Sequence, residues 1–443
     1  MTPPRVVVVG GGWAGLSAAT ALSRAGLGVT VLESARQLGG RARRVPFAGH
    51  RVDNGQHLIV GAYRATLELM STLGVDEVHA LRRHPLHLDM RSPAGRRVRL
   101  SAPRLPAPAH LLAALAGARG LSAHARWRAI GMCARLALRG FQLDTDISVA
   151  ELLGRYAQPS ALISDLWEPL CVAALNTPIE EASARVFLRV LRDSFTGTRR
   201  ASDLLFATTD LGALLPDPAL EFIEAHGGSV RLAQRVSALT VDKGAVRGVV
   251  ANGKAIEADH VVLAIPPHAC RSLLAPHPAL AALAASLHQF RYEPICTVYL
   301  QYPQPVSLPV PMLGMLGTTG QWAFDRGLSG QPGLIAVVIS SRGAHMARDN
   351  ATLVAGVANE LAMLFPQWPA PRETLVIREK RATFSCQVGM GAWRPGNAMP
   401  MPGGWLAGDH TDTGYPATLE GAVRSGLQCA RQIIAQTGSH EPS

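Results

Sequence analysis

Lysine is nearly absent from this chain, which has only Lys243, Lys254 and Lys380 among its 443 residues. Arginine supplies the rest of the 43 basic residues, and against 32 acidic residues they give a net charge of +11. Such an excess is typical of proteins that meet nucleic acid, an anionic membrane surface or a phosphate-bearing cofactor, and arginine-for-lysine usage also arises from genomic bias. The sequence has no zinc-finger spacing, no basic-zipper heptads and no motif that pairs aromatic with basic residues, so we expect no nucleic-acid partner.

Closely spaced cysteines and long apolar runs are also missing. The six cysteines are scattered, without Cys-x-x-Cys or metal-ligand spacing, which predicts reduced, mostly buried thiols in a cytoplasmic protein and no metal site. No apolar run reaches the roughly 18 residues of a membrane-spanning helix, and the four valines at 6–9 are too few for the core of a signal peptide. With 48% apolar and 17% charged residues, the chain is long enough for two or three globular domains.

Residues 5–33 (RVVVVGGGWAGLSAATALSRAGLGVTVLE) have the pattern of a strand–helix–strand unit. The β-branched run at 6–9 predicts a strand that is buried on both faces. The apolar periodicity at 16–25 predicts a helix, and 29–32 predicts a second strand. This order is typical of nucleotide-binding folds.

The glycines of this unit have the G-x-G-x-x-G spacing of dinucleotide-binding proteins. Gly10 permits a tight turn, Gly12 lets a pyrophosphate approach the backbone, and Gly15 lets the helix pack closely on the strand. Glu33 ends the second strand, where its carboxylate can accept hydrogen bonds from ribose hydroxyls. We therefore predict a dinucleotide site at the start of the helix, whereas the alternative is a turn that binds no ligand.

A second glycine-rich turn follows at 38–43 (LGGRAR). Backbone amides around Gly40 and the guanidinium of Arg41 are suited to phosphate. Together the two motifs resemble those of flavin-dependent amine oxidases and carotenoid desaturases, and nicotinamide dehydrogenases have no second motif of this kind. The resemblance implies that FAD is the cofactor, with Gly40 and Arg41 on its pyrophosphate and ribitol side.

A β-rich region lies at 228–265. Its apolar runs are separated by Asp-Lys-Gly at 242–244 and Asn-Gly-Lys at 252–254, which predicts a meander of strands. In the relatives the backbone at the position of Val236 contacts adenine. The run at 261–266 (VVLAIP) is expected to complete the nucleotide-binding sheet.

The chain ends with a third motif, WLAGD at 405–409 followed by TLEGAVRSG at 418–426. In the relatives this motif closes the flavin site. The resemblance implies that Gly408 and Asp409 bind the ribitol or pyrophosphate end. The helix that starts at Leu419 should direct its N-terminus at the pyrimidine oxygen of the flavin.

The fold implied by the resemblance is α/β, with a discontinuous Rossmann-like FAD-binding domain and an α+β substrate-binding domain of the amine oxidase/phytoene desaturase type. The FAD-binding domain is expected to comprise residues 1–75, 226–269 and 396–437. The substrate-binding domain is expected to comprise residues 76–225 and 270–395. Since only one dinucleotide fingerprint is present, the electrons must come from an external donor that the sequence does not identify.

Three stretches are narrower than the superfamily pattern: 53–64 (DNGQHLIVGAYR), 167–178 (WEPLCVAALNTP) and 378–384 (REKRATF). With the closing motif they resemble the squalene-associated flavoproteins, the hydroxysqualene dehydroxylases of bacterial hopanoid pathways, over nearly the whole chain. This resemblance implies reductive removal of the allylic hydroxyl of hydroxysqualene to give squalene and water. The substrate would be a hydrophobic isoprenoid in a dry apolar tunnel beside the flavin.

Loss of the hydroxyl requires a proton, because hydroxide leaves poorly. His57 is one predicted donor, since imidazole can hold a proton near neutral pH, and Gln56 is expected to orient the hydroxyl or the flavin edge. The alternative role of His57 is a hydrogen bond to the flavin or the backbone. Glu168 is the rival donor because burial would raise its pKa, and its alternative role is an ion pair with an arginine.

Amine oxidation is disfavoured by departures from that family. Amine oxidases place a lysine beside flavin N5, in a strand that resembles 295–302, but here no lysine lies between Lys254 and Lys380. Thr418 stands where those enzymes have an aromatic-cage tyrosine. Two other functions stay open: a carotenoid-type polyene desaturase, and a non-catalytic carrier of flavin and lipid.

A long isoprenoid hydrocarbon must be collected from a bilayer, because its solubility in water is negligible. Residues 110–141 combine leucines, Trp127 and Phe141 with several arginines, a pattern that suits helices lying on anionic lipid. The alternative is an amphipathic helix packed on the substrate-binding domain. We expect a cytoplasmic protein that associates peripherally with the inner face of the membrane.

Overall fold

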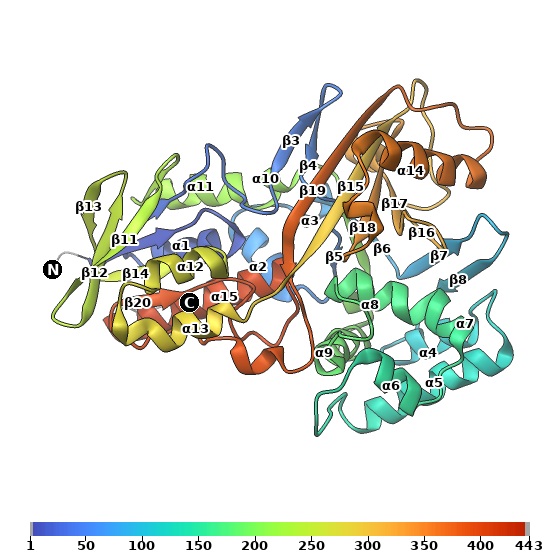
Figure 1. Cartoon of the computed structure of the whole chain (residues 1–443), viewed down its shortest axis with the longest axis horizontal. Helices are drawn as coiled ribbons and strands as arrows, with labels where there is room; N and C mark the ends of the chain where they lie inside the picture. The colour runs from blue at the N-terminus through green and yellow to red at the C-terminus, as the bar shows by residue number, and fades with distance from the viewer. Residues whose placement is uncertain (1–2, 439–443) are drawn as a thin grey trace.

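The computed structural model describes residues 3–438 and has two halves that lie side by side (Figure 1). A five-stranded parallel sheet forms the centre of one half. In spatial order its strands are β10 (Ser229–Arg231), β2 (Gly28–Leu32), β1 (Arg5–Val9), β14 (His260–Leu263) and β20 (Gly404–Leu406). Segments that are far apart in the sequence therefore build one sheet.

Helices cover this sheet because its central strands are apolar on both faces. α1 (Trp13–Arg24) contacts both α15 (Leu419–Thr437) and α11 (Pro216–Ala225). The approach of α15 is close: a Cβ placed on Gly426 would lie 2.2 Å from the carbonyl oxygen of Ala14. α15 therefore packs directly against α1.

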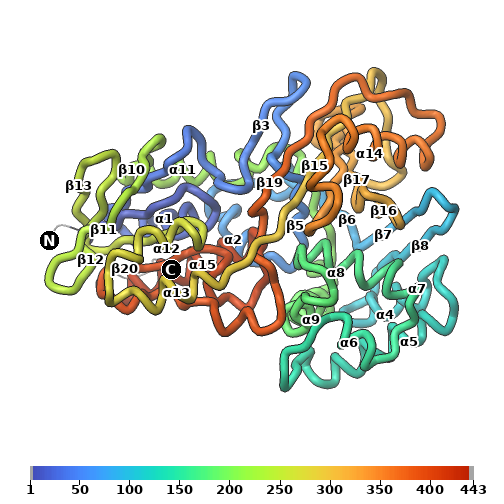
Figure 2. Tube along the Cα trace, viewed as in Figure 1, coloured from blue at the N-terminus to red at the C-terminus, as the bar shows by residue number. Residues whose placement is uncertain are grey.

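The predicted meander is present beside the parallel sheet. It is an antiparallel sheet of β11 (Val236–Asp242), β12 (Ala245–Ala251) and β13 (Lys254–Glu257). The chain then passes through β14 into α12 (Pro267–Leu274), η3 (Pro278–Leu280) and α13 (Ala281–His288). Figure 2 shows the meander at the outer end of this half.

A seven-stranded sheet forms the core of the other half. Its long strand β15 (Tyr292–Gln301) pairs antiparallel with β18 (Leu334–Ser340), which is buried throughout. Successive side chains of these strands point to opposite faces of the sheet. Ile335, Val337 and Ile339 face α14 (Asn350–Leu364) on the outside, whereas the alternate side chains face inward. In spatial order the strands are β19 (Glu373–Phe384), β15, β18, β17 (Trp322–Asp325), β16 (Met312–Met315), β7 (His87–Arg91) and β8 (Arg97–Ser101).

A group of helices packs below this sheet in the view of Figure 1. Several begin at a serine whose hydroxyl accepts a hydrogen bond from the first turn, as at Ser122, Ser148 and Ser183. The helices are α4 (Ala109–Ala116), α5 (Ala123–Leu138), α6 (Val149–Arg155), α7 (Ser160–Leu162), the π-helical turn η1 (Ile163–Trp167), α8 (Glu168–Leu175) and α9 (Ala184–Phe195).

Short elements join the two halves. The three-stranded sheet consists of β5 (Ile59–Val60), β9 (Leu204–Ala207) and β6 (Leu81–His84), and the hairpin pairs β3 (Arg44–Phe47) with β4 (His50–Asp53). The remaining short helices are α2 (Arg64–Thr72), α3 (Glu77–Ala80), α10 (Leu211–Leu214), η2 (Arg199–Ser202), η4 (Arg326–Ser329), η5 (Ala344–Met346) and η6 (Met390–Trp393).

The predicted α/β class with a Rossmann-like sheet and an α+β second half is confirmed. All six cysteines are buried and free, as their spacing predicted. The exact domain boundaries stay a prediction. Within residues 3–438, no helix combines the length and the apolar character needed to cross a bilayer.

Candidate active site

A cavity of about 1280 Å³ is walled by both halves of the molecule. This volume exceeds the roughly 300–1,000 Å³ of ordinary small-molecule sites, so it has room for a cofactor and a second large ligand. All predicted cofactor-binding residues except Gly15 line it, namely Gly10, Gly12, Glu33, Gly40, Arg41, Gln56, Val236, Gly408, Asp409 and Leu419. Residues of three distant motifs therefore meet at one cavity.

Backbone hydrogen bonds tie the first glycine-rich turn to β2 and to the second glycine-rich turn. Gly10 donates a hydrogen bond from its N–H to the carbonyl of Leu32 (2.8 Å), and Gly39 donates to the carbonyl of Gly11 (2.9 Å). Gly15 lies behind the cavity wall, where a Cβ would be 2.0 Å from the carbonyl oxygen of Gly10. This close approach agrees with the packing role predicted for Gly15.

Glu33 fixes the first turn as well as lining the cavity. Its carboxylate accepts hydrogen bonds from the N–H of Gly11 and from the N–H of Ala35, both at 2.7 Å. Only 8% of the residue is exposed. The predicted contact of Glu33 with a ribose would thus add to a role in holding the glycine turn.

The start of α1 has the free space and the unpaired donors that a phosphate-bearing cofactor requires. A Cβ built on Gly12 would meet nothing closer than the Cα of Gly40, at 3.9 Å. No side chain caps this helix at Gly12, so its first N–H groups face the cavity. The indole N–H of Trp13 is buried and has no hydrogen-bond partner among the described residues. These features fit FAD.

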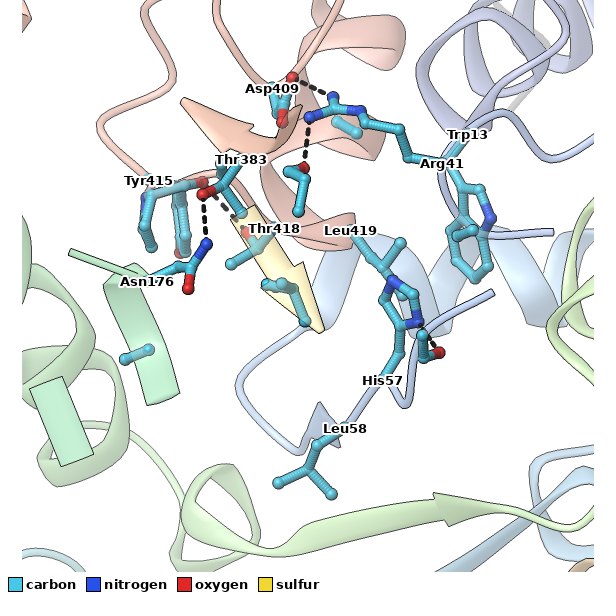
Figure 3. Close-up of a pocket in the computed structure, with 18 of the residues that line it drawn as sticks. Trp13, Arg41, His57, Leu58, Asn176, Thr383, Asp409, Tyr415, Thr418 and Leu419 are labelled. Carbon is cyan, nitrogen blue, oxygen red and sulfur yellow. Dashed lines mark hydrogen bonds and ion pairs between the residues drawn. The ribbon is translucent and has the colours of Figure 1, made fainter. Parts of the chain in front are cut away.

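Arg41 and Asp409 form an ion pair at the edge of this region (Figure 3). Arg41 Nη2 donates to Asp409 Oδ1 at 2.7 Å, and Nη1 donates to the carbonyl of Ala382 at 2.8 Å. Burial alone would raise the pKa of Asp409, but Arg41 and His410 outweigh it and hold that pKa well below its usual range. Asp409 is therefore a permanent anion that orients Arg41.

The N-terminus of α15 also opens on the cavity. Thr418 caps it by accepting a hydrogen bond from the N–H of Gly421 at 3.1 Å, and Leu419 lines the cavity. The fully buried Glu420 accepts hydrogen bonds from the N–H of Thr66 (2.9 Å) and from Arg424 Nε (2.7 Å). These contacts fix the direction of the helix dipole at the site.

The side chains of the polar stretch 53–57 anchor it through hydrogen bonds to other segments. Asp53 accepts from the N–H of Leu211 (2.8 Å), and Asn54 accepts from the N–H of Arg43 (3.1 Å). Gln56 Oε1 accepts from Arg326 Nη1 (2.9 Å). Three of the four polar residues thus fix the loop, and this loop carries His57 into the cavity.

His57 is a neutral imidazole in this arrangement. Its Nδ1 lies 2.7 Å from the carbonyl oxygen of Gly55, so Nδ1 carries the hydrogen and Nε2 is left without one. Burial lowers the pKa of His57, and Arg41 lowers it further. His57 therefore has the backbone hydrogen bond named as its alternative role, and in this state Nε2 accepts rather than donates a proton.

Glu168 is not brought to the cavity. It is exposed at the start of α8, and it is absent from the residues that line the cavity, although Leu166, Trp167 and Leu170 beside it are present. Burial and the neighbouring Glu180 raise its pKa. Glu168 is therefore not placed to donate a proton in the cavity, since its side chain leaves the helix on the solvent side.

Arg326 is a buried residue near the site that the sequence patterns did not reveal. It is only 2% exposed, and its Nε donates to Gln331 Oε1 at 2.9 Å. Its Nη1 lies 3.9 Å from Asp53 Oδ2. Burial raises the pKa of Asp53 to about 6, against the opposing effect of Arg326. Arg326 thus reaches from the second half to hold the loop that carries His57.

We expect Arg326→Met to lower the free energy of unfolding by about 3 kcal/mol at pH 8, because it removes the buried cation that is paired with the Asp53 carboxylate. The folded-state pKa of Asp53 is raised to about 6, so the cost of its charge grows from the ordinary carboxyl pKa up to about 6, and the buried carboxyl is mostly neutral at pH 5 and charged at pH 8. The loss should therefore shrink at pH 5. Urea unfolding at both pH values measures it, with exposed Arg82→Met as the matched control. Equal losses at pH 5 and pH 8 would contradict the coupling to Asp53.

The rest of the cavity is a predominantly apolar limb. Leu111 and Leu115 of α4, Trp322 and Phe324 of β17 and many other apolar side chains form its wall. Its polar members include Asn176, whose Nδ2 donates to Thr383 Oγ1 at 2.9 Å (Figure 3). Asp193 and Tyr415 also line the cavity. Tyr415 begins the closing stretch 415–422 that carries the family resemblance, but no role was predicted for it, and no motif contained Asp193.

The flavin containing amine oxidoreductase family matches residues 13–434 of this chain. The chain is 30% identical to a hydroxysqualene dehydroxylase of Rhodopseudomonas palustris, with 97% of this chain and 98% of that protein covered. It is 25% identical to a 15-cis-phytoene desaturase of Solanum lycopersicum, with 98% of this chain and 78% of that protein covered. The solved cyclohexylamine oxidase of Brevibacterium oxydans has a TM-score of 0.73 at 18% identity, with 98% of this chain and 100% of that chain covered.

The residues of the cavity and the family agree on the cofactor, which is FAD. The protein is an FAD-dependent oxidoreductase. The chain belongs to the flavin-containing amine oxidoreductase family and, within it, to the hydroxysqualene dehydroxylases.

Proposed function

We propose that this enzyme removes the hydroxyl of hydroxysqualene reductively and yields squalene. The observation that carries the proposal is the cavity itself, whose lining combines the cofactor motifs with many apolar side chains of the second half. Leucine and aromatic side chains are complementary to an isoprenoid chain. The similarity to the hydroxysqualene dehydroxylase along almost the entire chain supports the same reaction.

The reaction replaces a C–O bond by a C–H bond. FAD, when bound and reduced, supplies a hydride. The apolar limb binds the hydrocarbon, excludes water and keeps the allylic carbon at the cofactor region. The chain must also deliver one proton to the departing oxygen, and the lowered pKa of His57 together with its Nδ1 contact to the carbonyl of Gly55 favours a different donor.

Incubation of the purified protein with hydroxysqualene and chemically reduced FAD tests the proposal, with products identified by mass spectrometry. Squalene formation is the expected result. Additional double bonds in a polyene, formed with oxidised FAD, would identify a desaturase instead. Tight binding of hydroxysqualene and of the polyene without turnover of either would identify a carrier.

We also propose that α4 and α5 rest on the inner face of the membrane. Trp127 and Leu138 of α5 are 69% and 88% exposed. From residue 90 to residue 143 the chain has arginines but no acidic residue. Leu111 of α4 lines the cavity, so the same unit borders the substrate site. Exposed apolar groups among arginines are complementary to anionic lipid, and a lipid substrate could pass directly from there.

We expect Arg135→Glu/Arg139→Glu to weaken binding to anionic vesicles at least about 10-fold, since each basic residue near such a surface contributes about 1 kcal/mol. Sedimentation with phosphatidylglycerol-containing vesicles measures the binding. Val78→Ser serves as the control, because it removes an apolar side chain that is about as exposed as Trp127 but lies outside α4 and α5. Unchanged binding of the arginine variant would rule out this surface.

A further inference from the structure

A cluster of charged side chains surrounds Tyr415 on the cavity wall. The Tyr415 hydroxyl donates a hydrogen bond to Asp193 Oδ2. Arg189 Nε donates to the same oxygen at 3.2 Å, and Arg192 Nε lies 3.4 Å from Oδ1. Asp193 belongs to α9 of the second half, whereas Tyr415 precedes α15 of the FAD-binding half. The hydrogen bond therefore crosses the junction at which the cofactor region meets the apolar limb.

The ring of Tyr415 is in contact with two cations. The guanidinium carbon of Arg189 lies 4.5 Å from the ring centroid, and that of Arg424 lies 4.6 Å from it. The residue is 5% exposed. Both distances are within the range of cation–π contacts, which stabilise negative charge on the ring.

Asp193 differs from the other carboxylates that line the cavity. Glu33 and Asp409 are bound to the glycine turn and to Arg41, and Glu379 lies near Arg41. Among the described carboxylates of the cavity wall, Asp193 is the one that lies on α9, where Val190 and Leu191 of the same helix also line the cavity. An alcohol in the apolar limb would find its polar partners there.

We propose that Tyr415 is the catalytic acid of the site and that Asp193 is its hydroxyl-orienting partner. The inference rests on the proposed function. The substrate hydroxyl donates its hydrogen to the Asp193 carboxylate and accepts the hydrogen of the Tyr415 hydroxyl. As the C–O bond breaks, the phenol proton moves to the departing oxygen and water leaves. The hydride of the reduced flavin forms the C–H bond, and a solvent proton restores Tyr415.

The surroundings of Tyr415 suit both of its protonation states. Burial and the Asp193 carboxylate raise the pKa of Tyr415, so the hydroxyl keeps its proton at neutral pH until the substrate takes it. The phenolate formed afterwards is close to the guanidinium groups of both Arg189 and Arg424. Solvent can return the proton, because the side chain of Asp193 is 19% exposed.

A purely structural role would be to tie α9 to the loop before α15. The two roles differ in what they predict for ligand preference. A structural tie affects folding and binds alcohol and hydrocarbon alike, whereas a hydroxyl site favours the alcohol. Trp167 and Trp322 line the cavity, so quenching of tryptophan fluorescence can report binding of either lipid without turnover.

The test compares Tyr415→Phe and Asp193→Asn with the wild type, all loaded with FAD. Tyr302→Phe makes the same chemical change at a buried tyrosine in a different core cluster and is the control. We expect Tyr415→Phe to keep its FAD and its affinity for squalene, to lose preference for hydroxysqualene, and to lower kcat by about 10²–10⁴-fold. Asp193→Asn should weaken binding of the alcohol while the hydrocarbon still binds.

Wild-type kcat in Tyr415→Phe would overturn the inference, and so would an unchanged preference for the alcohol in both variants. If Tyr415→Phe does not fold, Asp193→Asn decides by the ratio of the two affinities. A wild type that prefers the alcohol through Tyr415 but never forms squalene would refute the proposed function alone. Squalene formation that needs neither side chain would refute the inference alone.

Discussion

Gly12→Ala is expected to give a folded protein that has lost its FAD. Gly12 has φ −81°, a conformation that alanine adopts freely, and a Cβ there would be 3.9 Å from the nearest protein atom. The protein itself therefore tolerates the methyl group. The empty space lies at the N-terminus of α1, where the pyrophosphate must approach the backbone. We expect FAD affinity to fall at least about 100-fold, equal to about 2.7 kcal/mol.

Gly15→Ala is the matched contrast, because the same methyl group there is opposed by protein. Its Cβ would lie 2.0 Å from the carbonyl oxygen of Gly10, so β1 and α1 must separate. This variant should lose thermal stability even without cofactor. Visible absorbance of the purified proteins reports bound flavin, and circular dichroism reports unfolding. Normal flavin content in Gly12→Ala would show that the cofactor lies elsewhere.

The cofactor half could be predicted from the sequence because its signals are local. Gly10, Gly12 and Glu33 belong to one strand–helix–strand unit, in which spacing along the chain determines position in space. The order of the later motifs then placed Asp409 and Leu419 at the same site. For such residues the fold adds distances and partners to a prediction that already named them.

The substrate half could not be predicted in the same way. The partners Asp193 and Tyr415 are 222 residues apart in the sequence, and Gln56 and Arg326 are 270 apart. No spacing rule relates such pairs, since tertiary packing alone brings them together. Glu168 shows the converse problem: the stretch around it is apolar on all sides, so its periodicity did not reveal which face of α8 meets solvent.

Arg41→Met should lower the stability of the protein without cofactor by about 3 kcal/mol at pH 7. The side chain of Asp409 is 7% exposed and would lose the cation that holds its charge. In the wild type the pKa of Asp409 is depressed, so its stabilising contribution is present above the ordinary carboxyl pKa and disappears only as pH falls through the depressed value. In the variant, burial without Arg41 would raise this pKa, and the charge would cost stability as pH rises.

The difference in unfolding free energy between wild type and Arg41→Met should therefore widen from pH 4 to pH 7, which urea unfolding can measure. Adding Asp409→Asn to Arg41→Met removes the unpaired charge and should recover most of the stability at pH 7. It should not recover FAD binding, because the guanidinium that faces the cofactor region is still absent. Recovery of both properties together would mean that Arg41 acts only by stabilising the fold. Recovery of stability alone, together with FAD binding retained by Asp409→Asn as a single variant, would identify Arg41 as a direct ligand of the cofactor.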